Sequence, residues 1–405
     1  MTGELMSMNR VPYQYTVVAL CTLAFFSTMV ARVVISPVVP DLTAAFSVST
    51  GTLGIALSGM WAAYALTQFP SGVLADRHGE RIVIMASIVV TGFASLLLAV
   101  SPTYPIFFIF AVSLGGGAGL VYSAATSLVT KESEETGRAI GIYIAGGPIA
   151  GLLAPPIAVA VGARFGWQAA IVLGAVCAVP ALVLFWTLVE PTEPVQPDIS
   201  LEDQLEIGVL IELITRPSIA YTMVLAIMGA FTWQATASFL PSFLEEFHGY
   251  SRTNASLLFS AYFVVHGATQ PLTGTLSDHF SRDVAALITM LSGIVGYGVL
   301  IFSSSPVAIV SAVALAGLAM SWGAPLQAKF MDNLKEDEMG TGFGLVRTVY
   351  MSVGALGSVV TGQLVDIAGW AEAFGLLVVF MTVSALLLVA SRLSDRLDHH
   401  NRNES

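Results

Sequence analysis

Twelve mostly apolar stretches, each close to the length of a membrane-crossing helix, occupy most of this chain. A helix needs about 20 such residues to cross the hydrocarbon core of a bilayer. Only 11% of the 405 residues are charged, which is too few to cover a water-soluble surface. The sequence therefore predicts an all-α integral membrane protein with transmembrane helices over residues 15–39, 51–74, 82–100, 104–128, 138–162, 168–189, 218–243, 254–276, 284–303, 306–330, 341–364 and 370–391.

The remaining composition excludes several classes of function. A net charge of −11 with only three lysines does not supply the basic surface that nucleic acids require. Cys21 and Cys177 lie inside apolar stretches and form neither a disulfide framework nor a metal-ligand spacing. No nucleophile–base pair, metal cluster or phosphate-binding glycine loop with a lysine occurs. The sequence predicts no enzyme, no metal and no cofactor. Because no nucleotide-binding site is predicted, any energy that the protein uses must come from gradients across the membrane.

Lysine and arginine are distributed unevenly among the predicted loops, and cytoplasmic loops are the ones that carry an excess of both. With the N-terminus in the cytoplasm, only Arg164 and Arg252 are outside, and Arg32 lies within the membrane. The first helix lacks a cleavage signature and is predicted to be retained. We expect a multi-pass plasma-membrane protein with both termini cytoplasmic. The Lys and Arg residues expected on the cytoplasmic side are Arg10, Arg77, Arg81, Lys131, Arg138, Arg216, Arg282, Lys329, Lys335, Arg347, Arg392, Arg396 and Arg402.

One long segment between the predicted helices cannot cross a membrane. Glu190–Arg216 is rich in proline and acidic residues and contains no spanning run. It predicts a cytoplasmic linker with a short amphipathic helix near Leu201–Leu213. The expected organisation is an N-terminal six-helix bundle, a linker, a C-terminal six-helix bundle and a cytoplasmic tail, over residues 1–189, 190–216, 217–392 and 393–405.

The two bundles carry an internal repeat. The pattern Gln-x3-Gly-x-Leu-x-Asp begins at Gln68 and again at Gln270, an offset of 202. The Gly-x3-Gly pattern at Gly137 and the Gly-Trp pair at Gly166 both return 203 residues later. Each pair falls on the same side of the membrane, which predicts parallel repeats related by an axis along the membrane normal. Transporters with this plan bind solute near the midplane between the halves.

A loop after the second predicted helix resembles the signature of the major facilitator superfamily, G-x-L-A-D-R/K-x-G-R/K-R/K. Residues 72–81 read GVLADRHGER and depart only at Glu80, where a base is usual; residues 274–282, GTLSDHFSR, are a degenerate copy. The resemblance covers essentially the whole chain. It implies two pseudo-symmetric six-helix bundles, and a secondary transporter that works as a monomeric unit and moves a small solute, with or without protons, by symport or antiport.

The resemblance also implies a gating role for this loop. Asp76 is expected near the start of the eleventh helix, around Gly340–Gly344, where the helix dipole favours an anion. Gly72 is expected to permit close helix contact, and Gly79 to supply a turn conformation that other residues reach with strain. The alternative is that the loop only fixes topology. The predicted gating residues are Gly72, Asp76, Arg77, Gly79, Arg81, Gly274 and Asp278.

Arg32 is the first candidate for solute contact. It lies eight residues before Pro40, about 12 Å along a helix, and therefore near the membrane midplane. Thr28 and Ser36 are expected to share its face. Ionisable residues at this depth are costly and usually have a function, and a guanidinium can bind a carboxylate bidentately. The alternative is that helix carbonyls or another polar helix neutralise Arg32 and it only fixes packing.

Two further groups are candidates at comparable depth. His266 titrates near neutral pH and either relays a proton or serves as a packed hydrogen-bonding residue. Arg347 is either a second cationic contact or an anchor that extends to the membrane interface. Other predicted lining residues, whose aromatic members also suit plain packing, are Tyr64, Gln68, Trp233, Gln234 and Trp322.

The absence of acids shapes the functional prediction. None of the 27 Asp and Glu residues falls in the middle of a predicted span. Many sugar carriers and cationic-drug exporters of the superfamily use a buried carboxylate there, so its absence beside Arg32 favours an organic anion such as a monocarboxylate. The alternative is a proton-coupled exporter of drugs or amphipathic compounds, since residues 147–151, GPIAG, partly match an exporter motif.

Overall fold

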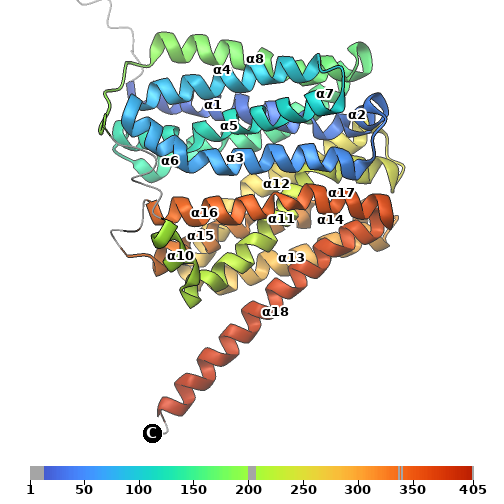
Figure 1. The fold of residues 1–405 in the computed structure, drawn as a ribbon. Coiled ribbons are helices and arrows are strands. Elements are labelled where there is room, and N and C mark those ends of the chain that lie inside the picture. The colour runs from blue at the N-terminus through green and yellow to red at the C-terminus, as the bar shows by residue number, and fades with distance from the viewer. Residues whose placement is uncertain (1–12, 199–206, 336–337, 339–340, 404–405) are drawn as a thin grey trace, which may run out of the picture.

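Every regular element in the described part of the computed structural model is helical (Figure 1). The structure describes residues 13–198, 207–335, 338 and 341–403. The predictions that concern Arg10, Gly340 and residues 199–206 of the linker therefore lie outside the described residues. The prediction of an all-α fold is confirmed.

The N-terminal half follows the predicted spans closely. Its first and fifth spans are each divided, the first by a short 3-10 segment at Ser36–Val38 and the fifth at Ala145. The helices are α1 (Tyr13–Val33), η1 (Ser36–Val38), α2 (Val39–Phe46), α3 (Thr50–His78), α4 (Glu80–Ala99), α5 (Tyr104–Glu132), α6 (Thr136–Ile144), α7 (Gly146–Phe165) and α8 (Trp167–Leu188).

The C-terminal half repeats this arrangement after a short linker helix, α10 (Ile207–Thr215). Its tenth and eleventh spans are divided, and its last helix continues past the predicted end at residue 391. The helices are α11 (Pro217–Glu246), α12 (Arg252–His279), α13 (Arg282–Phe302), α14 (Pro306–Ala319), η2 (Met320–Trp322), α15 (Gly323–Asn333), α16 (Thr341–Gly354), α17 (Leu356–Ile367) and α18 (Trp370–Asn403).

Two of the long helices are less apolar than the others. Ten segments of the described chain are long and apolar enough to cross a membrane. The two helices outside that set are α3 and α12, the second of each half, with 29 and 28 residues. Both carry the repeated Gly-x-Leu-x-Asp pattern and polar groups that face the other half. They complete the twelve helices.

The repeat is visible in how the helices begin. Ser49 and Ser251 cap α3 and α12, and each side-chain oxygen accepts a backbone hydrogen bond three residues on. Gly166 and Gly369 precede α8 and α18 with φ angles of +85° and +109°. A residue with a Cβ reaches such angles only with strain, which explains why glycine occupies both positions.

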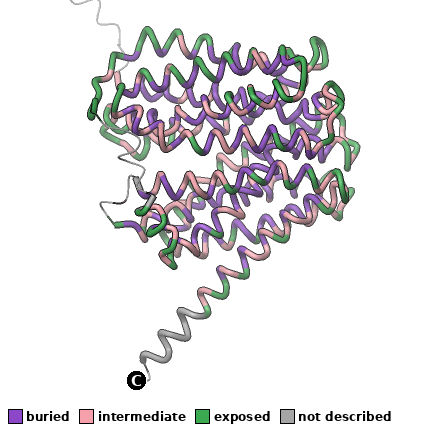
Figure 2. The backbone as a smooth tube through the Cα atoms, viewed as in Figure 1, coloured by how far each residue is buried: buried purple, intermediate pink, exposed green. Residues whose placement is uncertain are grey.

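The two halves lie side by side with their helices roughly parallel (Figure 1). We call the end that carries the Gly79 turn, α6 and α10 the linker end, and the end that carries α2 the distal end. Buried residues gather where helices lie against one another, whereas exposed residues gather on the outer surface and at the two ends (Figure 2). Large exposed apolar residues such as Phe93, Trp186 and Phe302 lie on this outward surface, as expected of a surface in contact with lipid.

Candidate functional site

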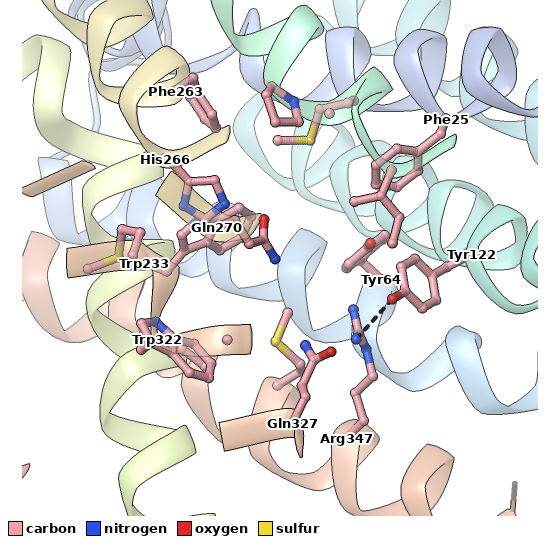
Figure 3. Close-up of a pocket in the computed structure, with 18 of the residues that line it drawn as sticks. Phe25, Tyr64, Tyr122, Trp233, Phe263, His266, Gln270, Trp322, Gln327 and Arg347 are labelled. Carbon is pink, nitrogen blue, oxygen red and sulfur yellow. Dashed lines mark hydrogen bonds between the residues drawn. The ribbon is translucent and has the colours of Figure 1, made fainter. Parts of the chain in front are cut away.

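A cavity of about 180 Å³ lies between the two halves (Figure 3). Residues of α1, α3, α5, α6 and α7 line it from one half, and residues of α11, α12, η2, α15 and α16 from the other. The lining residues are Phe25, Met29, Arg32, Tyr64, Tyr122, Ile144, Gly147, Pro148, Ala230, Trp233, Phe263, His266, Gln270, Met320, Trp322, Gly323, Gln327, Arg347, Tyr350 and Met351.

Arg32 is buried in the wall that the N-terminal half provides. Its guanidinium carbon lies 4.0 Å from the ring centre of Tyr64 and 5.2 Å from that of Trp61. Nε donates to the Thr28 carbonyl at 3.2 Å, while Nη2 is buried and has no hydrogen-bond partner among the described residues. A buried donor left unpaired is costly, so this nitrogen is available to a ligand oxygen.

The prediction that Ser36 shares a helical face with Arg32 is wrong. Helix α1 ends at Val33, one residue past Arg32, so the i+4 relation does not extend to Ser36. Ser36 lies in η1, and its hydroxyl donates to the Ser238 carbonyl of the other half at 2.9 Å. It joins the halves and does not line the cavity.

Arg347 reaches the same cavity from α16 in the C-terminal half. Its Nε donates to Gln68 Oε1 at 3.0 Å, and Nη1 donates to the Tyr122 hydroxyl at 3.2 Å. The guanidinium carbon also lies 4.1 Å from the Tyr122 ring centre. These contacts, drawn in part in Figure 3, place a second cation among residues of the opposite half.

Neither arginine has an acidic partner in the described part of the chain. The ten ion pairs found there involve other residues. No Asp, Glu or Lys is among the cavity-lining residues. Burying a charge without a counter-charge is expensive, so this arrangement favours a solute that supplies negative charge.

The opposite wall also carries polar groups from α12 and η2. His266 and Gln270 are neighbours one turn apart on α12, and Trp322 comes from η2 (Figure 3). The Nδ1 atom of His266 and the Nε1 atom of Trp322 are buried with no hydrogen-bond partner among the described residues. These atoms are available to a polar group of a ligand.

Aromatic side chains make up much of the remaining lining. Of the predicted aromatics, Tyr64, Trp233 and Trp322 line the cavity. Five further lining residues were not predicted from the sequence: Phe25, Tyr122, Phe263, Tyr350 and Gln327. Apolar and aromatic residues in a transmembrane helix carry no sequence signal that separates a cavity wall from ordinary packing, whereas Gln327, a polar residue inside a predicted span, was a usable signal.

Two of the predicted glutamines lie behind the cavity wall. Gln234, predicted to line the site, is fully buried between α11 and α16, where Nε2 donates to the Met351 carbonyl at 3.0 Å. Depth along a helix does not determine which way a side chain points, which is why this prediction was wrong. Gln68 does not line the cavity either, but its bond to Arg347 positions a residue that does.

The halves are joined on the distal side of the cavity. Arg252 pairs with Asp41 of the other half at 2.7 Å, and the Asp366 carboxylate accepts the backbone N–H groups of Thr50 and Gly51 at 3.1 and 2.8 Å. Between these contacts and the cavity, the Ser58 hydroxyl donates to the Ala355 carbonyl at 2.6 Å. This seal separates the cavity from the distal surface.

The loop that resembles the gating signature lies at the linker end. Gly79 has a φ of +87°, and a Cβ on it would lie 2.3 Å from the Thr192 carbonyl oxygen, so both conformation and space require glycine. Arg81 donates to the Trp186 carbonyl, and its own N–H to the Thr192 hydroxyl at 3.0 Å. Arg77 is exposed. The loop therefore holds the first residues of the linker.

Two expectations for this loop differ from the structure. Asp76 bonds through its backbone carbonyl to the Gln196 N–H, and its carboxylate has no hydrogen bond to a described residue of α16. A Cβ on Gly72 would find its nearest neighbour, Ser123 Cβ, at 3.9 Å, an ordinary contact. Gly72 is thus not needed for close packing in this conformation, because the neighbour that its Cβ would face, Ser123, belongs to the same half and leaves room for it.

In the C-terminal copy, Gly274 likewise has room for a Cβ, whose nearest neighbour would be Ala324 Cβ at 3.8 Å. Asp278 pairs with Arg282, which also pairs with Asp332 at 2.9 Å. Glu80, the departure from the signature, is fully buried and pairs with Lys131. The Glu80 and Arg282 positions are 202 residues apart and carry opposite charges, each matched within its own half.

Two pseudo-symmetric helix bundles around a central cavity define a multi-pass membrane transporter. The sequence profile of the Major Facilitator Superfamily matches residues 21–253 and 222–405. The chain belongs to this superfamily, and is a secondary transporter and not an enzyme.

Two distant relatives match almost the whole chain. The hexuronate transporter of Bacillus subtilis is 22% identical over 378 residues, covering 88% of this chain and 89% of its own. A protein of Cupriavidus necator described as "Probable sulfoacetate transporter SauU" is 23% identical over 396 residues, with 89% of each covered. A bacterial homologue of the lysosomal transporter Spinster, solved inward-facing and unoccupied, has a TM-score of 0.80 at 19% identity and covers 95% of this chain and 98% of its own.

Proposed function

We propose that the chain moves a small organic anion across the cell membrane by alternating access. The observation that carries this proposal is the pair of guanidinium groups, Arg32 and Arg347, that face one cavity with no acidic partner among the described residues. The names of the two relatives above, a hexuronate and a sulfoacetate transporter, support an anionic solute.

The proposed binding residues follow from the cavity. Arg32 binds the anionic group, Arg347 is a second cationic contact positioned by Gln68, and Tyr64, Trp233 and Trp322 enclose the solute. His266, with its unpaired Nδ1 atom, is the candidate for a proton that travels with the anion. Exchange of one anion for another is the alternative mode of coupling.

We further propose that the linker end is cytoplasmic and that the protein adopts an inward-open conformation here. Lys and Arg gather at the linker end, as cytoplasmic loops require, while Arg164 and Arg252 lie at the distal end. The halves are residues 1–189 and 217–392, joined by the linker 190–216 and followed by a cytoplasmic tail, 393–405. The seal at the distal end supports an opening toward the cytoplasm.

The gating role of the 72–81 loop remains part of this proposal. When the linker end closes, α3 approaches the start of α16, and the Asp76 carboxylate reaches N–H groups that favour an anion. Gly72 then faces a neighbour that it does not contact here. The 72–81 loop and its copy at 274–282 keep their shape during the movement. The residues that maintain them are Arg77, Gly79 and Arg81 in the first half, and Gly274 and Asp278 in the second.

A second candidate is an exporter of amphipathic compounds. Seven aromatic residues line the cavity, and Gly147 and Pro148 of the partial exporter motif are among the lining residues. In that case Arg32 stacks on Tyr64, contributes to packing and does not bind the solute. The two candidates differ in the solute that binds: a small anion in the first, an amphipathic cation in the second.

A thermal-shift screen of the purified protein separates the two candidates, because a ligand that binds the native state raises its melting temperature. Small carboxylates, phosphates and cationic dyes are tested on the wild type, on Arg32→Gln and on a matched control, Arg138→Gln, which removes an exposed guanidinium. We expect anions to stabilise the wild type and the control but not Arg32→Gln. Stabilisation by dyes alone, equal in all three proteins, contradicts the proposal.

A further inference from the structure

The cavity walls carry two permanent positive charges. Arginine does not lose its proton in proteins, so Arg32 and Arg347 remain cations at any accessible pH. No acid or lysine is among the lining residues that the structure describes, so these two charges have no counter-charge in the walls. A solute with a single negative charge leaves one of these charges without a counter-charge, which is unfavourable in a partly desolvated site.

Both guanidinium groups line the same cavity of about 180 Å³, so one small solute in it can contact both. Arg32 stacks on Tyr64, and Arg347 donates to Gln68. Tyr64 and Gln68 are four residues apart on α3, and therefore lie on one face about 6 Å apart along the helix axis. The two arginines therefore contact successive turns of α3, a separation on the scale of two anionic groups joined by a short carbon chain.

Both guanidinium groups also keep donor capacity for a ligand. Nη2 of Arg32 is buried and unpaired, and Nη2 of Arg347 has no hydrogen bond to a described residue, since its protein contacts use Nε and Nη1. Charge-assisted bonds from arginine to carboxylate or sulfonate oxygens are among the strongest hydrogen bonds available to a protein. Each cation can thus bind one end of a solute.

We infer that the solute is a small dianion, with two carboxylates or a carboxylate and a sulfonate on a short chain, and not a monocarboxylate. This inference rests on the proposed function as an anion carrier. Arg32 of the N-terminal half binds one anionic group and Arg347 of the C-terminal half binds the other, so a dianion contacts both halves at once. A monoanion engages one arginine and leaves the other charge exposed to the cavity.

Calorimetric binding of matched solutes near neutral pH tests the inference. Succinate is compared with butyrate, and sulfoacetate with ethanesulfonate, so that each pair differs by one anionic group on the same chain length. We expect each dianion to bind about ten- to a hundredfold tighter than its partner, the range for one additional bond to a charged group. Arg347→Gln is expected to lower the affinity for the dianions more than the affinity for the monoanions, and so to remove this preference.

Three further variants serve as controls for this test. Arg32→Gln is expected to weaken all four solutes, Arg138→Gln to change none, and Arg347→Lys, which keeps the charge, to retain part of the preference. Equal affinity within both pairs in the wild type overturns the dianion inference and leaves the anion-carrier proposal intact. Binding of neither pair, with stabilisation by cationic dyes alone, overturns both.

Discussion

The distal and linker ends of this protein are held together in different ways. At the distal end, charged and polar groups of one half bond to the other: Arg252 to Asp41, and Asp366 to the start of α3. At the linker end, the corresponding groups bond within one half, as Glu80 does to Lys131 and Arg282 to Asp332. Toward the linker end, the hydrogen bonds between described residues of the two halves stop at Gln68 and Arg347.

This difference explains how the same fold can expose one cavity to either side. Bonds within a half stabilise each bundle as a rigid body, whereas bonds between halves stabilise one particular arrangement of the two. Breaking the first kind lowers the stability of a bundle. Breaking the second kind changes the balance between conformations and leaves the bundles intact.

The largest expected effect comes from a glycine in the distal seal. A Cβ on Gly54 would lie 2.7 Å from the Ser358 carbonyl oxygen of the other half, so Gly54→Ala forces α3 and α17 apart. We expect the conformation described here to lose about 1–3 kcal/mol, the usual cost of overpacking. Thermal melting and the reactivity of a single cysteine placed at Ser238 measure the effect.

Gly72→Ala is the matched control at the linker end. Gly72 lies on the same helix, α3, but a Cβ there would have its nearest neighbour at an ordinary 3.9 Å. Alanine favours the helix by about 0.5–1 kcal/mol over glycine, so this variant should melt at the same temperature or slightly higher. An equal loss of stability in both variants would show that the two ends do not differ.

The second effect concerns the buried charge in the N-terminal half. Glu80 is fully buried, and its Oε1 accepts from Ser127 at 2.9 Å and pairs with Lys131, whose side chain is 41% exposed. Because that exposure screens the pair, we expect Glu80→Gln to cost about 1–2 kcal/mol in melting experiments without changing the conformational balance. The control Asp332→Asn, in the more exposed C-terminal pair, should cost less than about 0.5 kcal/mol.

A smaller effect is expected from the ion pair across the distal seal. Arg252 and Asp41 are 44% and 31% exposed, so solvent screens their interaction to about 0.5–1 kcal/mol. Arg252→Asp should raise the reactivity of a cysteine at Ser238 several-fold, and the exchanged pair Arg252→Asp with Asp41→Arg should restore it. Identical reactivity in all three proteins would mean that this ion pair does not contribute to the seal.

The smallest effect is a pH dependence at the linker end. The Arg216 guanidinium, hydrogen-bonded to Glu338, lowers the pKa of that carboxyl from 4.5 to about 2. A carboxyl with a depressed folded-state pKa stabilises the protein above pH 4.5, and this contribution disappears as the pH falls toward 2. The difference in melting temperature between the wild type and Glu338→Gln should therefore shrink over this range. A difference that stays constant with pH contradicts the assignment.

Much of the fold was predictable because lipid imposes a strict rule on sequence. Helices must be long and apolar, and glycine, proline and charge mark their ends, so the twelve spans match the observed helices. The breaks at Ala145 and Ala355 were not predicted. Glycines beside these breaks pack against other helices, since a Cβ on Gly146 would lie 2.6 Å from the Thr22 carbonyl oxygen, and such tertiary contacts leave no local signal.

The candidate site was predictable only in part. Arg32, His266 and Arg347 are ionisable groups at membrane depth, and because such groups avoid lipid, all three face one cavity. Gln234 was placed wrongly because depth does not give rotation about the helix. The expected contact of the Asp76 carboxylate with α16 is not made among the described residues, and a sequence does not say in which conformation of a protein a contact forms.

Distances between spin labels test the central claim, that the two halves move in opposite senses around one cavity, most directly. One pair of labels is placed at the distal end, on Ala45 and Asn254, and one at the linker end, on Glu134 and Lys335, all exposed. Both native cysteines, Cys21 and Cys177, are replaced by alanine. When succinate is added, we predict that a population appears in which the 45–254 distance lengthens while the 134–335 distance shortens. Distances that stay fixed, or that change in the same sense, would contradict the account.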